Sequence, residues 1–404
     1  MSDKNSVVMV GLGYIGLPTA ALMASKGLKV LGVDIQQEVV DTINAGQIHI
    51  VEPDLEGLVK NQVERGNLVA STQPETADTY LIAVPTPFKG DHMPDLKYVE
   101  AATRTLLPHL KEGDLFIIES TSPVGTTEAM QKLVEAERPE LAGKIYMAYC
   151  PERVLPGNVI HELENNDRVI GGINEASTEQ AIAFYGKFVK GKAHPTNSRT
   201  AEMCKLVENS YRDVNIAFAN ELSLICREAD IDVWELISLA NRHPRVNILQ
   251  PGPGVGGHCI AVDPWFIASQ FPKQANIVRA AREINDAKPA WVVEEVLTAT
   301  RSWKQENDGE PQITCFGLSY KPDIDDLRES PSVKIHQSLK ALDLQVKVVE
   351  PYLVKNIGAF ENLQLEEALK TTDIAVLLVP HTQLKAIDWG KRDFIVLDFC
   401  GMMR

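Results

Sequence analysis

The chain has 404 residues, of which 44% are hydrophobic and 24% charged, so it is long enough for two or three domains, each with its own core. A formal net charge of -15 argues against a nucleic-acid or anionic-membrane surface, and no apolar run reaches membrane-spanning length. The six scattered cysteines lack the spacing of a disulfide framework or a metal site. With no room for a signal peptide before the first strand, we expect a cytoplasmic protein with reduced thiols and no metal.

The first strong motif is a strand, a glycine turn and a helix. Residues 7–10 form an apolar run, and Gly11, Gly13 and Gly16 follow it in the spacing G-x-G-x-x-G. These glycines permit a tight turn, the approach of a pyrophosphate and close helix packing. A second predicted strand ends on Asp34, which is suited to bind ribose hydroxyls and favours NAD over NADP. The alternative is a structural turn without a ligand.

Two further buried strands, at 79–84 and 115–119, lead into polar turns that carry Thr86 and Thr121. Ligands of open α/β sheets lie beyond the carboxyl ends of the strands. Both threonines are therefore candidates to contact the cofactor, and the alternative for Thr86 is an ordinary turn residue.

A strand at 144–148 leads into a loop with the adjacent residues Glu152 and Arg153. The loop should lie on the same ligand edge of the sheet. The two charges fit a binding site and fit a solvated salt bridge equally well. We expect the first domain to close near residue 195, after a helix at about 177–189.

From Thr200 the pattern is helical, without proline or glycine until Pro244. Lys205, Asn209 and Arg212 fall near one face of that helix, where they could anchor a sugar hydroxyl and a phosphate or simply face water. Two more helices, at about 275–286 and 288–304, complete an all-helical middle region.

Between these helices lies a glycine- and proline-rich loop, residues 251–259, that ends on Cys259 and precedes Asp263. Such a backbone allows close approach of a ligand, and His258 with the glycine amides could favour a nucleophilic thiolate. The alternative is a tight surface loop with an incidental buried cysteine.

After a polar linker, strands at 312–316, 345–350, 373–379 and 394–398 alternate with helices at about 331–342 and 364–370. This repeats the first domain, with only Gly317 left of the glycine motif. The loop after the first of these strands supplies Lys321 and Arg328, either of which could neutralise phosphate.

In this order the motifs resemble the NAD-dependent nucleotide-sugar 6-dehydrogenases, which include the UDP-glucose and GDP-mannose enzymes, over nearly the whole chain. The motifs are the glycine turn with Asp34, Pro85-Thr86-Pro87, Ser120-Thr121-Ser122-Pro123-Val124-Gly125, Pro151-Glu152-Arg153, Lys205 with Asn209, Gly256-Gly257-His258-Cys259 with Asp263, Tyr320-Lys321-Pro322 and Arg328-Glu329-Ser330. Segments 149–157 and 241–247 are most similar to the members that oxidise UDP-N-acetyl-D-mannosamine.

The resemblance implies an α/β fold with an N-terminal NAD-binding Rossmann domain (1–195), a central all-helical dimerisation region with the cysteine loop (196–304) and a C-terminal Rossmann-like nucleotide-sugar-binding domain (312–404). It also implies a homodimer and a product that is a uronic-acid precursor of surface polysaccharide.

The implied reaction is a four-electron oxidation of the C6 alcohol to a carboxylate, with two NAD and one water. The implied catalytic residues are Lys205, Asn209, Asp263 and Cys259, with Glu152 or Asp263 as the base for the hydrolytic water. The implied NAD contacts are Gly11, Gly13, Tyr14, Ile15, Gly16, Asp34, Thr86, Thr121 and Arg328. The implied nucleotide-sugar contacts are Arg153, Val154, Lys205, Asn209, Arg212, His243, Arg245, Gly256, Tyr320 and Lys321, and Arg245 would reach the neighbouring subunit's sugar.

Three alternatives remain. The same chemistry could act on UDP-N-acetylglucosamine or UDP-glucose. A two-electron 3-hydroxyacid dehydrogenase would need neither Cys259 nor a second α/β domain. A non-catalytic NAD-binding regulator would show damaged catalytic positions, and none is visible.

Overall fold

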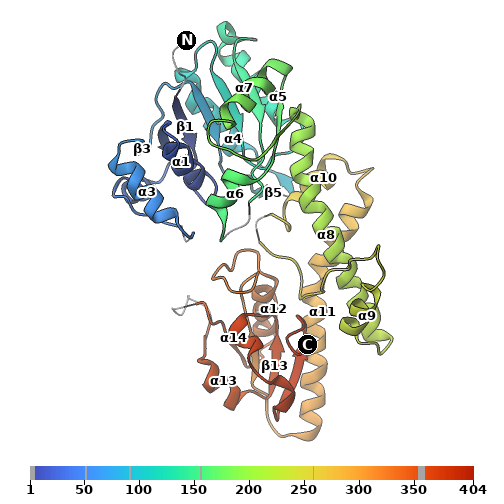
Figure 1. Ribbon diagram of the computed structural model, residues 1–404. Coiled ribbons are helices and arrows are strands. Elements are labelled where there is room, and N and C mark those ends of the chain that lie inside the picture. Colours follow the sequence, from blue (N-terminus) through green and yellow to red (C-terminus); the bar gives the residue numbers. More distant parts are fainter. Residues whose placement is uncertain (1–4, 51, 91, 155–156, 258, 354–359) are drawn as a thin grey trace. The chain divides into compact units, whose positions relative to one another are not determined.

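The computed structural model describes residues 5–50, 52–90, 92–154, 157–257, 259–353 and 360–404. The chain forms two compact units, residues 1–208 and 209–404, and each contains a parallel sheet with helices packed on it (Figure 1). This confirms the predicted fold class, with a Rossmann sheet near each end of the chain and helices between them. The finer three-part division into 1–195, 196–304 and 312–404 stays a prediction.

The strands of the first unit are β1 (Ser6–Val10), β2 (Lys29–Val33), β3 (Leu68–Ser71), β4 (Thr79–Ile82), β5 (Phe88–Lys89), β6 (Met93–Pro94), β7 (Leu115–Ile118), β8 (Tyr146–Tyr149), β9 (Arg168–Gly172) and β10 (Ala193–Asn197). Its helices are α1 (Gly16–Ser25), α2 (Gln37–Asn44), α3 (Leu55–Glu64), α4 (Lys97–Leu106), α5 (Thr126–Glu137), α6 (Val159–Asn165) and α7 (Glu175–Tyr185). Helix α8 (Ser198–Glu228) continues from the first unit into the second.

The second unit contains α9 (Val233–Ala240), α10 (Asp263–Gln270), α11 (Asn276–Glu306), β11 (Ile313–Phe316), α12 (Pro331–Ala341), β12 (Val346–Val349), α13 (Leu365–Thr371), β13 (Ile374–Leu377), α14 (Thr382–Lys385) and β14 (Ile395–Asp398). Short 3-10 turns, Leu107–His109 and Pro139–Leu141 in the first unit and Trp389–Lys391 in the second, complete the elements.

The large sheet has the order β10-β9-β8-β7-β4-β1-β2-β3, and the small sheet has the order β12-β11-β13-β14. All neighbours are parallel except β8 and β9. In the large sheet the chain order reverses between β1 and β4, and in the small sheet it reverses between β11 and β13. Such reversals open a crevice at the carboxyl ends of the strands, which is where ligands of these folds bind.

The two faces of the large sheet bury separate cores, because successive side chains of a strand point to opposite faces. Val7 and Met9 pack with residues of α1, α2 and α7, whereas Val8 packs with residues of α4 and α5. In the small sheet, Ile313 and Cys315 pack toward α11 and α12, and Phe316 packs toward α13 and Trp389. Helices thus cover both faces of each sheet.

Several features differ from the sequence expectation. The helical pattern predicted from Thr200 to Pro244 is not continuous, because residues 229–232, with Asp230 at φ 53°, separate α8 from α9. The predicted helices at 275–286 and 288–304 are one helix, α11, with Pro289 inside it. An interior proline costs about 3 kcal/mol, but buried side chains on both sides of Pro289 keep the helix continuous. Strand β10 and helix α10 were not predicted, since β10 is only partly buried and α10 begins at a proline-bearing segment.

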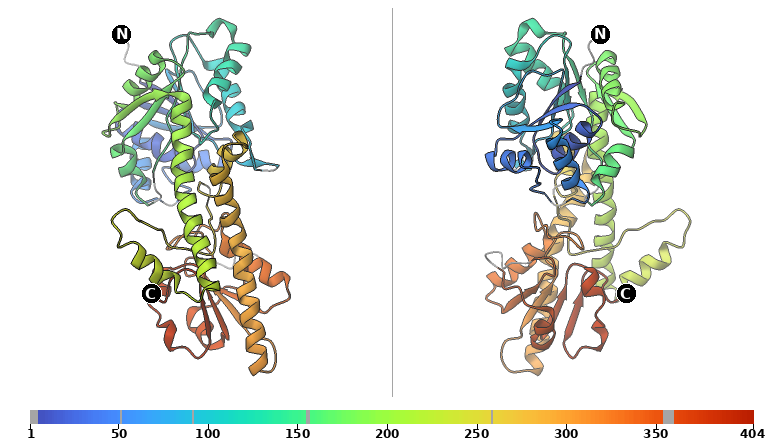
Figure 2. Two further views of the ribbon diagram at one scale, coloured as in Figure 1. Left: turned by 90° about the vertical axis from the view of Figure 1, so that its right-hand side faces the viewer. Right: turned by 60° about the vertical axis from the view of Figure 1, so that its left-hand side comes forward.

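Within the second unit, α8 and α11 lie side by side (Figure 2). The two helices share a buried row of polar side chains. Arg282 forms an ion pair with Asp213 at 2.7 Å, and both side chains are almost fully buried. Asn285 donates to Asp213 at 2.8 Å and accepts from Asn220 at 2.8 Å. The side chains of the row therefore bind one another, as buried polar groups generally do, and among the described residues only Asp213 Oδ2 and Arg282 Nε of these side chains lack a hydrogen-bond partner.

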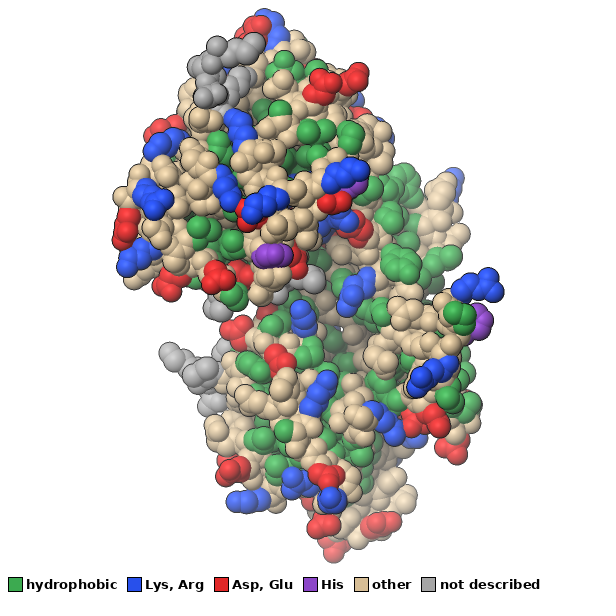
Figure 3. All heavy atoms as spheres, in the orientation of Figure 1, with side chains coloured by type: hydrophobic (Ala, Val, Ile, Leu, Met, Phe, Trp, Pro, Cys, Tyr) green, Lys and Arg blue, Asp and Glu red, His purple; other side chains and the backbone are tan. Residues whose placement is uncertain are grey.

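On the surface, Lys and Arg side chains are mixed with Asp and Glu over the face shown in Figure 3. On this face the excess negative charge is therefore distributed over the surface and does not form one acidic patch. In the described part of the chain, no helix is long and apolar enough to cross a membrane.

We expect the stability of the protein to carry a pH dependence from Lys288, which donates to Ser223 in the same buried row. Burial lowers the pKa of Lys288 to about 7, and Glu295 offsets this only in part. An unfolded lysine titrates near pH 10.4, so between these values the folded state binds fewer protons and the free energy of unfolding should rise with pH. The slope should not exceed about 1.4 kcal/mol per pH unit.

Replacement Lys288→Met should remove this slope and raise the free energy of unfolding by roughly 1–4 kcal/mol at pH 7. Urea unfolding at pH 7 and pH 9.5 measures both effects. The matched control is Lys340→Met, which changes an exposed lysine of the same unit. Parallel pH dependences of wild type and Lys288→Met would contradict the prediction.

Candidate active site

The turn after β1 has the geometry of a dinucleotide-binding turn. Gly11 has φ 91°, and a Cβ added there would lie 2.4 Å from the Ala83 carbonyl oxygen. A Cβ at Gly16 would lie 1.8 Å from the Gly11 oxygen, whereas one at Gly13 meets nothing within 4 Å. Gly11 and Gly16 are thus required by the fold, and the open space at Gly13 fits a pyrophosphate at the amide end of α1.

Asp34 fits the ribose of NAD. Its Oδ2 accepts the amide of Leu12 at 3.1 Å and its Oδ1 accepts the amide of Gln36 at 3.0 Å, so the carboxylate is fixed beside the glycine turn. It stays half-buried, which leaves it able to accept from a ligand hydroxyl. Tyr14, a predicted NAD contact, is 44% exposed at the same turn, and Ile15 next to it is half-buried.

The structure also brings Thr86 and Thr121 together. Both are half-buried at the carboxyl ends of neighbouring strands, and Thr86 donates its hydroxyl to the Thr121 carbonyl at 2.7 Å. Ser120 beside them donates to the Val84 carbonyl at 2.8 Å. The residues of this edge fit NAD, and their roles as cofactor contacts stay predictions.

Glu152 does not pair with Arg153, so the solvated salt bridge considered from the sequence is wrong. Glu152 is buried and pairs with the buried Arg168 at 3.0 Å, while Arg153 pairs with Glu208 at 2.7 Å. The other oxygen of Glu152 accepts the Arg153 amide at 2.6 Å. Arg168 begins β9, and its position under the loop could not be read from sequence spacing.

Arg168 belongs to a larger buried group. Its guanidinium lies 5.0 Å from the centre of the Tyr185 ring, and Tyr185 donates to Glu119 at 2.6 Å. Burial raises the pKa of Glu119 to about 7, although the charge of Arg168 pulls it down. One cation thus faces two carboxyl groups, Glu119 and Glu152, beneath the Glu152 loop.

Lys205 is held against that loop. Its ammonium donates to the Glu152 carbonyl at 2.8 Å, and the side chain is half-buried. The buried Arg168–Glu152 pair therefore supports the backbone that positions Lys205. The described residues of the loop end at Val154, which packs on the core of the first unit; Leu155 and Pro156 lie outside the described residues.

In the second unit the structure gathers Asn209, Cys259 and Asp263. Asn209 donates its amide to Asp263 Oδ2 at 2.5 Å, and Asp263 is buried at the start of α10. The Cys259 carbonyl accepts the Asp263 amide at 2.8 Å, and the Cys259 side chain is exposed, which excludes the interpretation as a buried structural cysteine. His258 lies outside the described residues.

The backbone of the cysteine loop is fixed by residues that the sequence analysis missed. Asn220 accepts the Gly252 amide at 2.9 Å, and Arg282 donates to the Ile260 carbonyl at 3.5 Å. Both belong to the buried polar row between α8 and α11. The sequence signal that could have identified Asn220 and Arg282 is the presence of polar residues at core-facing positions of long helices.

Tyr320 packs against the same loop. A Cβ at Gly256 would lie 2.8 Å from the Tyr320 Cβ, and one at Gly257 would lie 2.8 Å from its ring, so both positions must be glycine. The Gly257 amide donates to the Arg328 carbonyl at 3.3 Å. Gly256 and Tyr320, two predicted substrate contacts, are therefore neighbours.

The remaining predicted contacts are mostly exposed basic residues: Arg212, His243, Arg245 and Lys321. His243 accepts the Arg245 amide at 3.3 Å through Nδ1. Arg328, predicted to contact NAD, pairs with Asp326 at 2.6 Å in the second unit. No group of three or more His, Cys, Asp and Glu side chains in the described residues could hold a metal ion.

Comparison with known proteins identifies the family. Three models of the UDP-glucose/GDP-mannose dehydrogenase family match in succession: the NAD binding domain over 5–189, the central domain over 199–287 and the UDP binding domain over 314–403. The chain belongs to this family. The dehydrogenase is thus an NAD-dependent oxidoreductase of nucleotide sugars, which confirms the resemblance and sets aside both the hydroxyacid dehydrogenase and the non-catalytic regulator.

Two different names occur among relatives of the dehydrogenase that are more than half identical to it. A UDP-N-acetyl-D-mannosamine dehydrogenase of Escherichia coli is 56% identical, with 95% of each chain covered. An NDP-N-acetyl-D-galactosaminuronic acid dehydrogenase of Ralstonia nicotianae is 54% identical, with 99% of this chain and 96% of the relative covered. The solved UDP-D-ManNAc dehydrogenase of Pyrococcus horikoshii is 38% identical, with a TM-score of 0.90, and the match covers 99% of this chain and 96% of that one.

The turn geometry predicts that two glycine substitutions will affect different properties, one the stability of the fold and the other the affinity for NAD. Gly11→Ala should destabilise the first unit by at least about 1–2 kcal/mol, because φ is positive and the new Cβ meets the Ala83 oxygen. Gly13→Ala should leave the melting temperature nearly unchanged and weaken NAD binding at least about tenfold, because its Cβ enters the pyrophosphate space. Thermal unfolding and NAD titration separate the two. Unaltered NAD affinity in Gly13→Ala would refute the assignment of that space.

Proposed function

We propose that the enzyme oxidises UDP-N-acetyl-D-mannosamine at C6 to the uronate, with two NAD and one water consumed. The observation that carries the chemistry is the exposed Cys259 thiol on a glycine loop tied to the Asn209–Asp263 pair. An exposed thiol on such a loop is suited to covalent catalysis, which a simple alcohol dehydrogenase does not need. The choice of sugar rests on the similarity to the UDP-N-acetyl-D-mannosamine dehydrogenases.

In the first oxidation, the C6 hydroxyl loses its proton as the C6–H hydride departs. Asp263, whose carboxylate is oriented by the Asn209 amide, would hold a water that takes this proton. The ammonium of Lys205, steadied by the Glu152 carbonyl, would stabilise the developing oxyanion. NAD, held by the Gly11–Gly16 turn and Asp34, supplies a hydride acceptor when bound, and two molecules are used in succession.

In the second oxidation, the Cys259 thiolate adds to the aldehyde carbon, and the carbonyl electron pair moves to oxygen to give a thiohemiacetal. Loss of a second hydride from that carbon gives a thioester. Water then adds to the thioester, the C–S bond breaks, and the carboxylate leaves while Cys259 recovers its proton. Covalent capture keeps the reactive aldehyde in the site.

Two carboxylates are candidates for the base that activates the hydrolytic water. Glu152 is ion-paired with Arg168, and its other oxygen accepts a backbone amide. Both oxygens of the Glu152 carboxylate already have partners within the protein and are not offered to a water. We therefore favour Asp263 as the base and assign Glu152 the support of Lys205.

The proposed substrate and cofactor contacts follow from the family's motifs. The proposed contacts are Arg153, Val154, Lys205, Asn209, Arg212, His243, Arg245, Gly256, Tyr320 and Lys321, and the proposed cofactor contacts include Tyr14, Ile15, Thr86, Thr121 and Arg328. The exposed cations among them suit a diphosphate, whose charge an otherwise acidic protein must bind locally.

We propose a homodimer that forms through α8. Tyr211, Phe218 and Ile225 are 71%, 52% and 53% exposed, and their seven-residue spacing places them on one face of this helix. A large apolar stripe in water favours burial against a second copy of the same stripe. The exposed loop with His243 and Arg245 would then be able to reach the partner's sugar. We place the enzyme in the cytoplasm, where NAD and nucleotide sugars are available.

A second candidate substrate is UDP-N-acetylgalactosamine. It is favoured by the 54% identity to the galactosaminuronic acid dehydrogenase of Ralstonia over nearly the full chain. The two sugars differ in stereochemistry at C2 and C4. The chemistry at C6 would be the same.

The sugar is tested by NADH formed per limiting nucleotide sugar, measured by absorbance with excess NAD. We expect two NADH per UDP-N-acetyl-D-mannosamine and little from the N-acetylgalactosamine, N-acetylglucosamine and glucose nucleotides. One NADH per sugar would mean that the aldehyde is released and the thioester scheme is wrong. Two NADH from another sugar alone would keep the scheme and change the substrate.

Cys259→Ala should abolish net acid formation while the affinity for UDP stays within about twofold, because the thiol is needed only for the covalent step. Product analysis by mass spectrometry and calorimetric titration with UDP measure the two. Cys204→Ala, at a half-buried cysteine in α8, is the matched control and should keep the acid output. Unchanged acid formation by Cys259→Ala would remove this thiol from the mechanism.

Phe218→Glu should weaken the proposed dimer by roughly 100-fold in dissociation constant, because each dimer would bury two carboxylates in the apolar stripe. Sedimentation across a range of concentrations gives the constant. Val69→Glu, at an exposed apolar position in β3 of the first unit, is the control and should not change it. A monomeric wild type, or a Phe218→Glu variant as dimeric as wild type, would exclude this interface.

A further inference from the structure

The C-terminal sheet repeats the glycine turn of the first sheet in atomic detail. Gly317 has φ 91°, as Gly11 has, and its amide donates to the Val349 carbonyl at 2.9 Å, as that of Gly11 donates to Val33 at 2.8 Å. The next amide, Leu318, donates to Glu350 Oε2 at 2.6 Å. Glu350 therefore occupies the place that Asp34 has in the first sheet.

The two carboxylates differ in what surrounds them. Asp34 is half-buried, whereas Glu350 is 2% exposed and is covered by His381, which is fully buried. Nε2 of His381 lies 3.1 Å from Glu350 Oε2. Burial alone would raise the pKa of Glu350, but the hydrogen bonds from His381, Leu318 and Ser319 outweigh it and hold the pKa below its ordinary value.

The tautomer of His381 follows from its second contact. The Asp323 amide donates to Nδ1 of His381 at 3.0 Å, so Nδ1 is an acceptor and the proton is on Nε2. His381 is thus a neutral imidazole that donates to the Glu350 carboxylate. The pair is complete without a ligand, and the carboxylate is not offered to a ribose.

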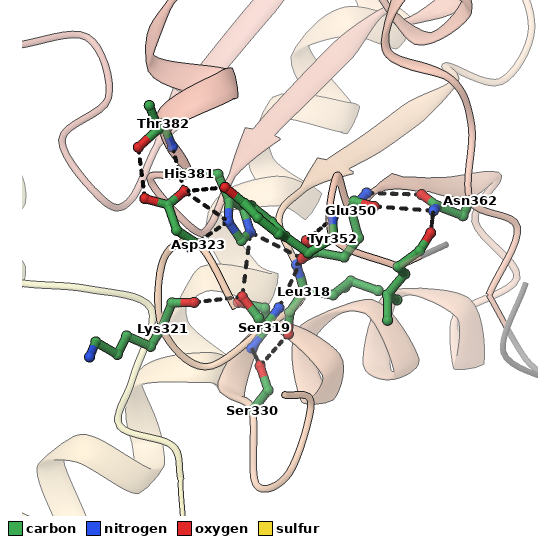
Figure 4. A network of polar contacts seen from close by, with 12 residues as sticks. Leu318, Ser319, Lys321, Asp323, Ser330, Glu350, Tyr352, Asn362, His381 and Thr382 are labelled. Atoms are coloured by element: carbon green, nitrogen blue, oxygen red, sulfur yellow. Dashed lines mark hydrogen bonds and ion pairs between the residues drawn. The ribbon is translucent and has the colours of Figure 1, made fainter. Parts of the chain in front are cut away.

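The pair fixes both ends of one short segment, residues 318–323 (Figure 4). At its start, Leu318 and Ser319 donate their amides to Glu350 at 2.6 and 3.0 Å. At its end, Asp323 donates to His381, and Ser319 Oγ reaches across to the Lys321 carbonyl at 2.7 Å. The segment is therefore closed into a loop over the buried pair.

Asp323 is held in a conformation that few residues adopt. Its φ is 62°, and its carboxylate accepts the amide and the hydroxyl of Thr382 at 2.8 and 2.7 Å and the hydroxyl of Tyr352 at 2.9 Å. Aspartate adopts positive φ more readily than most residues, and here three hydrogen bonds to the Asp323 carboxylate hold it in that conformation. The end of the segment is thus specified as strongly as its start.

Between the two anchors lie Tyr320 and Lys321, which are proposed to bind the nucleotide sugar. The Lys321 side chain points away from the network and is exposed (Figure 4). The Tyr320 ring packs on Gly257, two residues before Cys259. Movement of the segment would therefore shift one proposed phosphate contact and the backbone of the cysteine loop together.

We propose that Glu350 and His381 are positioning residues, which fix Tyr320 and Lys321 for the uridine diphosphate part of the substrate and, through Tyr320, the loop that carries Cys259. This inference rests on the proposed function for the role of the two contacts. Glu350, at the position that Asp34 has in the first sheet, would therefore hold a loop rather than the ribose of a ligand.

The test compares variants of His381 that remove one contact at a time. His381→Gln keeps a donor that can reach Glu350, His381→Asn keeps an acceptor for the Asp323 amide, and His381→Ala keeps neither. The control is His336→Leu, which changes another buried histidine of this domain; its ring nitrogens have no hydrogen-bond partner among the described residues. Calorimetric titration with UDP and the KM values for nucleotide sugar and NAD are measured for each full-length variant.

We expect His381→Ala to weaken UDP binding and to raise the KM for the nucleotide sugar about tenfold or more, with the KM for NAD within about twofold of wild type. His381→Gln and His381→Asn should each restore part of the UDP affinity, and His336→Leu should leave it unchanged. Alkylation of Cys259 by iodoacetamide should also slow or quicken in His381→Ala and not in His336→Leu.

Equal UDP affinity in wild type and His381→Ala would overturn the proposal, and so would a His336→Leu variant that loses as much affinity or an equal rise in the KM for NAD. UDP titration and alkylation need no turnover, so they decide the inference even if wild type oxidises none of the nucleotide sugars. That last result would refute the proposed function alone. A wild type that does not bind UDP would overturn the inference itself.

Discussion

The constraint on which both sheets depend is the sharp turn at a glycine with positive φ after the first strand. In each sheet this turn aims the next backbone amide at a carboxylate that ends the second strand: Leu12 at Asp34, and Leu318 at Glu350. A side chain at Gly11 or Gly317 would collide with the neighbouring strand's extension. One backbone solution therefore sets the ligand edge of the first sheet and the loop edge of the second.

The helices use a different constraint, the satisfaction of buried polar groups. Arg282, Asp213 and Asn285 join α8 to α11, and the row continues to Asn220. Because Arg282 and Asn220 also bind the backbone around Cys259, packing of the two helices and placement of the thiol are not independent. A continuous α11 is needed for this, which is why tertiary packing overrides the local preference of Pro289.

The sequence allows the local features to be predicted and hides the long-range ones. The glycine turn, Asp34 and the Lys205–Asn209 spacing follow from strand and helix periodicity and from short motifs. The partner of Glu152 could not be predicted in this way. Arg168 lies in β9, which pairs antiparallel with β8, and no local motif places this residue beside Glu152. The pairing of Glu350 with His381 likewise joins residues that follow two different strands and are 31 positions apart in the sequence, so no spacing rule predicts it.

Buried polar pairs lie under the loops to which ligand contacts are assigned. They are the ion pairs Arg168–Glu152 under Lys205 and Arg282–Asp213 beside the Cys259 loop, and the hydrogen-bonded pair His381–Glu350 under Tyr320. Burying such groups gains little net stability, since desolvation offsets most of their attraction. A hydrophobic core of the same volume would be at least as stable, but it tolerates small shifts of the chain above it. Directional hydrogen bonds to backbone amides and carbonyls do not tolerate such shifts, because a shift of the loop would leave a buried group unpaired. The proposed reaction brings one carbon to a hydride acceptor and then to the Cys259 thiol. Such a reaction needs loops fixed in this way, so stability is given up at the places where the position of the chain matters most.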